Sequence, residues 1–133
     1  MKLTKSVDYV LRIILCLSSS DKRVTMPTLV EKTNVSYHNV MKLVQVLTKA
    51  DIVETIQGKY GGVVLKQCLD DFSLKDVIEL MEGPVMLSDC FHADCYCQFM
   101  PGCQIKSVLG TVQSDILNVL ENTKIKSMVE EVK

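Results

Sequence analysis

Residues 25–50 have the sequence TMPTLVEKTNVSYHNVMKLVQVLTKA, which predicts two helices joined by a short turn. Pro27 is tolerated in the first turn of a helix, and Asn34 interrupts that helix. Ser36 is a favourable cap for a second helix over residues 37–50. Two helices in this arrangement are typical of a helix-turn-helix.

The second of these helices has one apolar and one polar face. Aliphatic side chains at helical spacing form the face that we expect to be buried, namely Val40, Leu43, Val44 and Leu47. The opposite face carries hydrogen-bonding and cationic groups without an acid: Tyr37, His38, Asn39, Lys42, Gln45 and Lys49. Such groups suit contact with phosphates and base edges, so this face is the candidate DNA-binding surface.

Two short strands are expected next, over residues 52–57 and 63–65, joined by the glycine-rich segment 58–62. The pair predicts a β-hairpin wing, with Lys59 and Tyr60 at a tip that can reach a DNA groove. The segment has neither a Walker pattern nor a following helix, which argues against a nucleotide-binding loop. Since the sequence also lacks a nucleophile elbow, an enzyme is not expected.

A first helix is expected to begin after Thr4 and to run to about Ser19. Asp8 lies one turn into its otherwise apolar face. One explanation is a carboxylate that the helix N-terminus favours. The other is that Asp8 is paired or bound to a metal, because a buried carboxylate is costly otherwise.

Four of the six cysteines lie in one stretch, Cys90-Phe-His-Ala-Asp-Cys95-Tyr-Cys97-Gln-Phe-Met-Pro-Gly-Cys103. A secreted scaffold would spread its cysteines along the chain, so no disulfide framework is expected. Thiolates crowded into one loop repel one another unless a cation neutralises them, which favours a metal or an iron–sulfur cluster. A structural zinc site usually has two Cys-x2-Cys pairs, which are missing here. Reduced thiols without a ligand are the alternative.

A long helix is expected over residues 104–121, after a capped helix over 74–82 and before a short last helix that Thr123 caps. Its apolar stripe consists of Ile105, Leu109, Val112, Ile116 and Val119, widened by Val108 and Leu120. Such a stripe needs a partner surface, and a second copy of the same helix predicts a homodimer. Gly110 suggests a close approach of two helices.

Length, composition and charge limit the classes of protein that this sequence can belong to. The 133 residues form one domain, or one domain with an appended helix. Neither a signal peptide nor an apolar run long enough to cross a membrane is present, so we expect a cytoplasmic protein with reduced thiols. The net charge of −1 hides an asymmetry, because residues 1–66 carry ten Lys/Arg and five Asp/Glu, whereas 67–133 carry five and eleven. A basic half suits phosphate binding.

These residues together resemble a known family. Leu3-Thr-Lys-Ser-Val-Asp-Tyr-Val-Leu-Arg12 is similar to the opening of the Rrf family of bacterial winged-helix regulators. Further matches lie at the family's recognition helix, wing and cysteine loop: Val35-Ser36, Lys42, Leu47, Gly58, Gly61-Gly62, Leu65 and Gln104-Ile-Lys106. The resemblance implies a mainly α fold with a small β-hairpin wing. Its implied parts are a winged helix-turn-helix DNA-binding domain (1–83), a cluster-binding loop (84–103), and a dimerisation helix with a C-terminal helix (104–133).

Within the family the sequence is most similar to the nitric-oxide-sensing repressors, on His38-Asn39, Lys42 and Asp8. That branch uses a carboxylate at the position of Asp8 as a ligand, across the dimer, to a 4Fe–4S cluster. Another branch binds a 2Fe–2S cluster with three cysteines and a histidine beyond the third, and no histidine follows Cys103 here.

The cysteine loop departs from the three cysteines of the family by one extra thiol. The expected ligands are Cys90, Cys97 and Cys103 together with Asp8, and Cys95 competes with Cys90 for the first position.

The resemblance therefore implies a homodimeric repressor that binds double-stranded DNA and senses nitric oxide through an iron–sulfur cluster, 4Fe–4S in preference to 2Fe–2S. Two alternatives stay open. One is a regulator of cluster biogenesis or oxidative stress from the 2Fe–2S branch. The other is a zinc-binding or clusterless thiol protein that acts as a dimeric interaction module.

Overall fold

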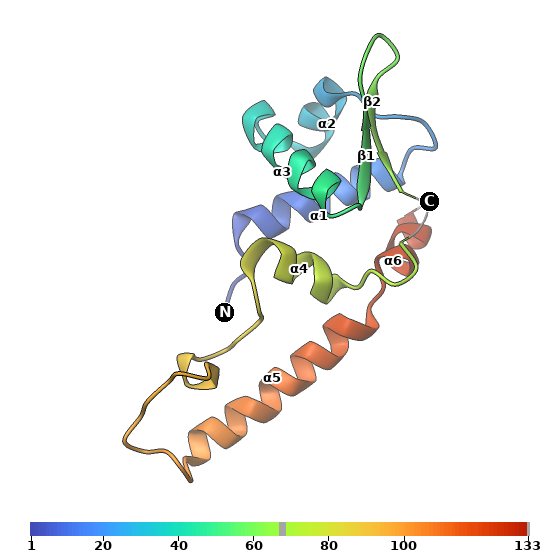
Figure 1. The fold of residues 1–133 in the computed structure, drawn as a ribbon. Coiled ribbons are helices and arrows are strands. Elements are labelled where there is room, and N and C mark those ends of the chain that lie inside the picture. The colour runs from blue at the N-terminus through green and yellow to red at the C-terminus, as the bar shows by residue number, and fades with distance from the viewer. Residues whose placement is uncertain (67–68, 133) are drawn as a thin grey trace.

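The computed structural model describes residues 1–66 and 69–132, with side chains as far as residue 130. The elements are α1 (Lys5–Ser18), α2 (Met26–Thr33), α3 (Tyr37–Lys49), β1 (Val53–Ile56), β2 (Gly62–Leu65), α4 (Leu74–Glu82), a short 3-10 helix η1 (Asp89–Phe91), α5 (Gln104–Asn122) and α6 (Ile125–Val132). Figure 1 shows two parts: α1–α4, the hairpin and α6 lie together, and α5 extends away from them to the loop that contains η1. The predicted mainly helical fold with one hairpin is confirmed.

Helix α1 lies at the centre of the core. One face is buried almost completely, with Val7, Val10, Ile13, Ile14 and Leu17 no more than 3% exposed. That face packs against α2, α3, α4, β2 and α6. Thr4 caps the helix by accepting a hydrogen bond from the backbone N–H of Val7, as its sequence position predicts.

The helix-turn-helix forms from local signals. Helix α2 has Pro27 in its first turn and is capped at its end by Asn34. Asn34 has a left-handed backbone conformation (φ 55°), which asparagine adopts more readily than most residues do. The Ser36 hydroxyl then accepts a hydrogen bond from the backbone N–H of Asn39 at 3.3 Å and starts α3. The apolar side of α3 is buried as predicted, with Val40 and Leu47 fully enclosed.

The wing is an antiparallel hairpin in which Val53 lies opposite Leu65 and Ile56 lies opposite Gly62. Val24 adds a bridge on the other side of β2, through two backbone hydrogen bonds with Val63 of 2.8 and 2.9 Å. Gly62 makes this close pairing possible, because a Cβ there would lie 2.9 Å from the carbonyl oxygen of Val24.

A second bridge ties the end of α5 to the rest of the molecule. The backbone N–H of Leu74 donates to the Thr123 carbonyl at 2.8 Å, and that of Ile125 donates to the Phe72 carbonyl at 2.9 Å. The prediction that Thr123 caps the last helix is wrong. Its hydroxyl donates to the Val119 carbonyl and closes α5, because a threonine at this point can bond back to the preceding turn.

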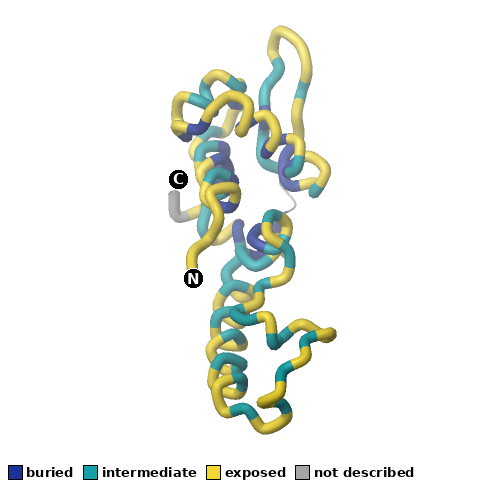
Figure 2. The backbone as a smooth tube through the Cα atoms, turned by 90° about the vertical axis from the view of Figure 1, so that its left-hand side faces the viewer, coloured by how far each residue is buried: buried dark blue, intermediate teal, exposed yellow. Residues whose placement is uncertain are grey.

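Helix α5 has no buried residue, although the structure describes all of it. Four apolar side chains on one side are exposed: Ile105 (72%), Val108 (62%), Val112 (39%) and Val119 (64%). In Figure 2 the buried positions are confined to the other part of the molecule. Gly110 does not mark a helix approach within the subunit, since a Cβ there would lie 3.6 Å from the Phe91 ring of the loop. Within the described residues, no helix has both the length and the apolarity that a membrane span requires.

We predict that the cap of α4 makes stability depend on pH. Asp76 accepts a hydrogen bond from the backbone N–H of Ser73 at 2.8 Å, and this bond is the main cause that lowers the pKa of the Asp76 carboxyl. Since the folded pKa is depressed, the contribution is complete above the unfolded value of roughly 3.9 and is lost as the pH falls through the folded pKa. Asp76→Asn should lower the free energy of unfolding by about 0.5–1 kcal/mol at pH 7, the usual size for a carboxylate at a helix N-terminus.

Urea unfolding of both proteins at several pH values between neutral and acidic measures this difference. It should shrink as the pH falls below roughly 4. Asp71→Asn is the matched control, because the Asp71 side chain is exposed and makes no hydrogen bond or ion pair among the described residues. A difference that is the same at every pH would contradict the argument.

Candidate functional site

The cysteine loop is attached to α5 at two points. The backbone N–H of Leu87 donates to Gln113 Oε1 at 2.9 Å, and the Phe91 ring lies over Gly110. The loop ends at Cys103, which is the N-cap of α5, and its Sγ accepts a hydrogen bond from the backbone N–H of Lys106 at 3.4 Å. One cysteine is therefore fixed at the positive end of the helix dipole, which favours negative charge on sulfur.

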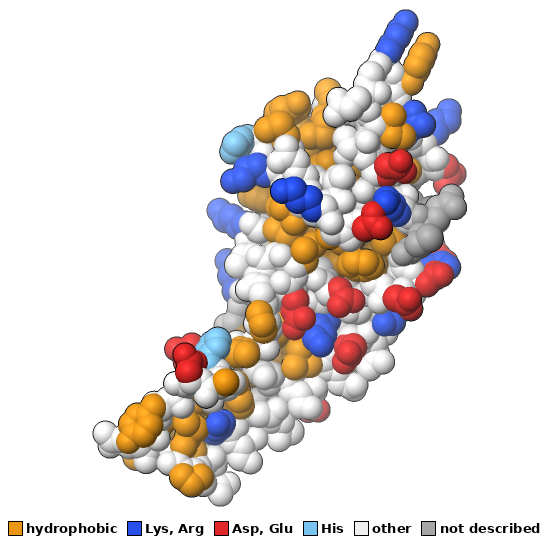
Figure 3. Space-filling view, viewed as in Figure 1, with side chains coloured by type: hydrophobic (Ala, Val, Ile, Leu, Met, Phe, Trp, Pro, Cys, Tyr) orange, Lys and Arg blue, Asp and Glu red, His pale blue; other side chains and the backbone are white. Residues whose placement is uncertain are grey.

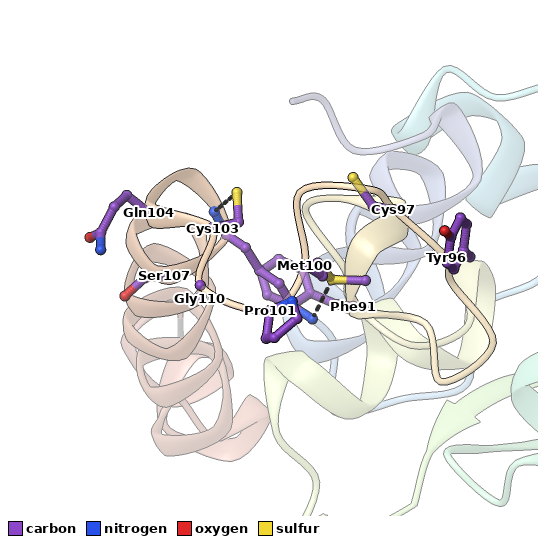
Figure 4. Close-up of a pocket in the computed structure, with 11 residues that line it drawn as sticks. Phe91, Tyr96, Cys97, Met100, Pro101, Cys103, Gln104, Ser107 and Gly110 are labelled. Carbon is purple, nitrogen blue, oxygen red and sulfur yellow. Dashed lines mark hydrogen bonds between the residues drawn. The ribbon is translucent and has the colours of Figure 1, made fainter.

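Three of the four loop cysteines line one cavity. This cavity, of about 680 Å³, lies at the start of α5 between the loop and the helix, and Cys90, Cys97 and Cys103 all contribute to its wall. All three are half-buried and free of disulfides. Cys90 Sγ lies 3.1 Å from the Ser88 hydroxyl. An adjoining cavity of about 780 Å³, shown in Figure 4, includes Cys97 and Cys103 but not Cys90.

Cys95 faces a different hollow. It lines a separate depression of about 430 Å³ with Asp89, His92 and Asp94, all from the same loop. His92 Nε2 lies 3.9 Å from an Asp89 carboxylate oxygen, so the imidazole also points away from the three-cysteine cavity. The extra thiol and the loop histidine are thus separated from the other three cysteines.

Asp8 lies on the outward side of α1, in the first turn. Its carboxylate forms an ion pair of 2.9 Å with Arg12, one turn later. The Arg12 guanidinium also donates to the backbone carbonyl of Thr33 at 3.3 Å and lies 5.6 Å from the centre of the Tyr9 ring. The prediction that Asp8 lies on the apolar face of α1 is wrong, because its side chain is 59% exposed. The structure supports the simpler explanation, a carboxylate near a helix start, and adds its connection through Arg12 to the end of α2.

The donor set fits an iron–sulfur cluster. Thiolates are the usual ligands of such clusters, and three of them share a cavity that one amide N–H already supplies with a hydrogen bond to sulfur. In the part of the chain that the structure describes, no three histidine, cysteine, aspartate or glutamate side chains converge as a closed metal site. Asp8 does not line this cavity within the subunit, so it could complete the donor set only from a second subunit.

The candidate DNA-binding side chains of α3 are all exposed. Tyr37, His38 and Asn39 occupy its first turn, and Lys42, Gln45 and Lys49 follow on the outward face. Tyr37, Gln45 and Lys59 help to line one groove of about 750 Å³ between α3 and the wing. The structure therefore brings the two predicted DNA-binding elements to either side of a single groove.

The wing tip is held in place from outside the hairpin. Lys59 Nζ lies 5.8 Å from the centre of the Tyr60 ring, and Tyr60 is 79% exposed. The Tyr60 carbonyl accepts a hydrogen bond of 3.0 Å from Arg23, which precedes the bridge to β2. Figure 3 shows Lys and Arg side chains spread over this end of the molecule, while acidic side chains gather over the middle.

Two residues of this surface are absent from the sequence-based prediction. Met41 lines the groove and is 37% exposed, one turn after Tyr37 and one turn before Gln45. Its helical spacing from Tyr37 and Gln45 could have revealed it, but a thioether is only a weak acceptor and does not mark a DNA contact. Arg23 had no local signal, because its partner Tyr60 lies 37 residues away.

Comparison with known proteins agrees with this geometry. The sequence profile of the family Rrf2, described as iron-dependent transcriptional regulator, matches residues 3–131. The HTH-type transcriptional regulator NsrR of Halalkalibacterium halodurans is 31% identical over 97% of this chain and 90% of its own length.

Two solved structures share the fold. CymR (YrzC), the global cysteine regulator of B. subtilis, has a TM-score of 0.79 at 22% identity, covering 98% of both chains. IscR of T. potens has a TM-score of 0.76 at 21% identity, covering all of this chain and 89% of its own. Since the profile spans nearly the whole sequence, this protein belongs to the Rrf2 family of DNA-binding transcriptional regulators and is not an enzyme.

Proposed function

We propose that this protein is a homodimeric repressor that carries an iron–sulfur cluster and releases its DNA operator in response to nitric oxide. The observation that supports this most is the shared cavity of Cys90, Cys97 and Cys103, which excludes Cys95. The similarity to relatives named NsrR, together with the resemblance of the first helix and recognition helix to nitric-oxide-sensing repressors, supports the choice of signal.

The proposed ligands are these three thiolates and Asp8 of a second subunit. Three sulfur donors would leave one iron of a 4Fe–4S cluster without a protein ligand. A carboxylate can serve as this fourth ligand. When bound, such a cluster provides iron that reacts with nitric oxide. Asp8 would be a harder and weaker donor to iron than a thiolate, so it would be the ligand that is displaced most easily.

The contacts of Asp8 connect this ligand set to the helix-turn-helix. Asp8 pairs with Arg12, and Arg12 donates to the carbonyl of Thr33, the last residue of α2. Thr33 directly precedes the Asn34 turn that leads into α3. A change in the partner of the Asp8 carboxylate would therefore change the force that Arg12 exerts on the turn before the recognition helix. A sensor needs an element with two arrangements, and this turn is the one that we propose.

A regulator of the IscR type is the second candidate, supported by the fold shared with IscR of T. potens. A histidine ligand is the feature that would favour it. His92 lines the hollow of Cys95 and not the three-cysteine cavity, and no histidine follows Cys103. The 4Fe–4S proposal is therefore preferred. The absorption spectrum separates the two, because a 4Fe–4S centre has one broad band and a 2Fe–2S centre has several resolved bands.

We predict that anaerobically purified protein contains iron and sulfide, and that Cys90→Ala, Cys97→Ala and Cys103→Ala each abolish the cluster. Cys95→Ala is the matched control and should keep it, because this thiol faces another hollow. Asp8→Ala should keep a cluster with an altered spectrum. Iron and sulfide assays with absorption spectra measure all five variants. Loss of the cluster in Cys95→Ala and its retention in Cys90→Ala would show that Cys95, and not Cys90, is the first ligand.

The signal is tested with the same preparations. Nitric oxide should weaken binding of the wild-type protein to a duplex selected from a random library by about 5- to 150-fold, the usual range of allosteric coupling. Fluorescence anisotropy under anaerobic conditions measures this affinity. The Cys103→Ala protein should show no response. An unchanged wild-type affinity after nitric oxide has altered the cluster spectrum would exclude nitric oxide as the signal.

We predict that Lys42 and Lys59 contact phosphates. Each alanine variant should weaken DNA binding and reduce the slope of log affinity against log salt by about one. Lys126→Ala is the control, because Lys126 lies on α6 and pairs with Asp70. Titrations at four salt concentrations measure the slopes. Slopes equal to that of the wild type in both variants would contradict the proposed phosphate contacts of α3 and the wing.

We predict that the exposed stripe of α5 forms the dimer seam. Val112→Glu should weaken dimerisation at least about tenfold, because a carboxylate would be buried against apolar side chains. Ser114→Glu adds the same charge at an exposed position away from the stripe and should have little effect. Analytical ultracentrifugation measures the association. A wild-type protein that is monomeric at micromolar concentration would contradict the proposed dimer.

A further inference from the structure

Lys106 is the single cation in a long acidic stretch. Between residues 76 and 123 the sequence contains seven Asp/Glu and no other Lys or Arg. A lysine in this setting does not belong to a solvated basic face of the kind that α3 carries. Its charge therefore needs a local explanation.

The position of Lys106 is unfavourable for the helix. It is the third residue of α5, and the first turn of this helix contains no acidic residue. The positive end of the helix dipole lies there, which disfavours a cation and favours an anion. Helix stability alone would place a carboxylate at this point, so the lysine runs against the local preference.

Each of the two nitrogen atoms of Lys106 lies close to a sulfur atom. Its backbone N–H donates to Cys103 Sγ at 3.4 Å, and its ammonium Nζ lies 3.2 Å from the thioether Sδ of Met100. These are the two dashed lines in Figure 4. A thioether is a weak acceptor, and no carboxylate of the described residues forms an ion pair with this half-buried ammonium.

Lys106 also lines both cavities at the start of α5. It shares one with Cys97 and Cys103, and the other with Cys90, Cys97 and Cys103. A half-buried ammonium with only a weak acceptor thus stands in the wall of the cavity into which three thiols open. Negative charge in that cavity is the complement that no described carboxylate supplies through an ion pair.

We propose that Lys106 is the fixed counter-charge of the three-cysteine cavity and, resting on the proposed function, a positioning residue for the anionic cluster held there. Thiolates repel one another, and a cation within the wall of their cavity offsets that repulsion. The same charge stabilises the reduced, more negative state of a thiolate-ligated cluster more than the oxidised state. Lys106 therefore raises the reduction potential of the cluster without being one of its ligands.

The experiment compares the full-length wild type with Lys106→Met, which keeps the length of the side chain, Lys106→Arg, which keeps the charge, and Lys22→Met. Lys22 is the control, since its side chain is exposed in the segment before α2 and loses the same charge. The first measurement is the midpoint potential of the cluster-loaded protein. The second is made on reduced, cluster-free protein. It is the ratio of the rates at which the cysteines react with a dianionic aromatic disulfide and with a neutral one.

Lys106→Met should lower the midpoint potential and reduce the ratio of rates by about three- to tenfold, the effect of one nearby charge on a dianion after screening. Lys106→Arg should restore both values, and Lys22→Met should change neither. Far-UV circular dichroism of each variant checks the fold, and Lys106→Gln, which also removes the charge, takes the place of Lys106→Met if that variant does not fold.

The two measurements separate the inference from the function on which it rests. A wild type that binds no cluster would refute the proposed function, and the ratio of rates would still decide the role of Lys106. Equal ratios in the wild type and Lys106→Met would overturn the counter-charge. A cluster whose potential is the same in both proteins would overturn the effect on the cluster.

Discussion

The packing of α1 is the constraint on which the rest of the structure depends. One face of this helix is buried against α2, α3, α4, β2 and α6, and the other presents Asp8 and Arg12. Because protein interiors are close-packed, α1 cannot shift without moving the elements that surround it. The same helix therefore holds the helix-turn-helix together and carries the carboxylate proposed to reach a cluster. The proposed ligand needs no separate element, since Asp8 lies on the outside of the core helix.

Local signals were enough to predict most of the fold. Apolar periodicity located α1 and α3, and Ser36 and Asn34 set the ends of the turn between α2 and α3, because caps and burial act over a few residues. Contacts between distant segments could not be predicted, such as Arg23 with Tyr60 or Arg12 with the Thr33 carbonyl. The spacing of the cysteines also left the first ligand open, since the path of the loop decides which thiols share a cavity.

In a single subunit, the apolar side of α5 is not covered by any other described element. Helix α5 has 19 residues and none of them is buried, although its apolar stripe would be a core face elsewhere. The loop before it is held to the same helix by Gln113 and by the contact of Phe91 with Gly110. A second copy that covers the stripe would also bring another α1, with its Asp8, into the assembly. The proposed dimer seam and the proposed cross-subunit ligand thus have a common physical origin in the exposed side of α5.

In the proposed dimer, two routes lead from the cysteine loop towards the recognition helices, and both pass through an α1 helix. One is α5, about 28 Å long at 1.5 Å per residue, which begins at Cys103 and is tied at its far end to the bridge of Phe72 with Ile125. The α6 helix that follows packs on α1. The other route is the partner's Asp8, through Arg12 to the end of α2. A helix transmits displacement along its axis, whereas an exposed ion pair transmits little force unless one partner is held. The proposed bond of Asp8 to iron would supply that fixed point, so the weaker route would act only while a cluster is bound. In this proposal the state of the cluster would be passed on to the helix-turn-helix.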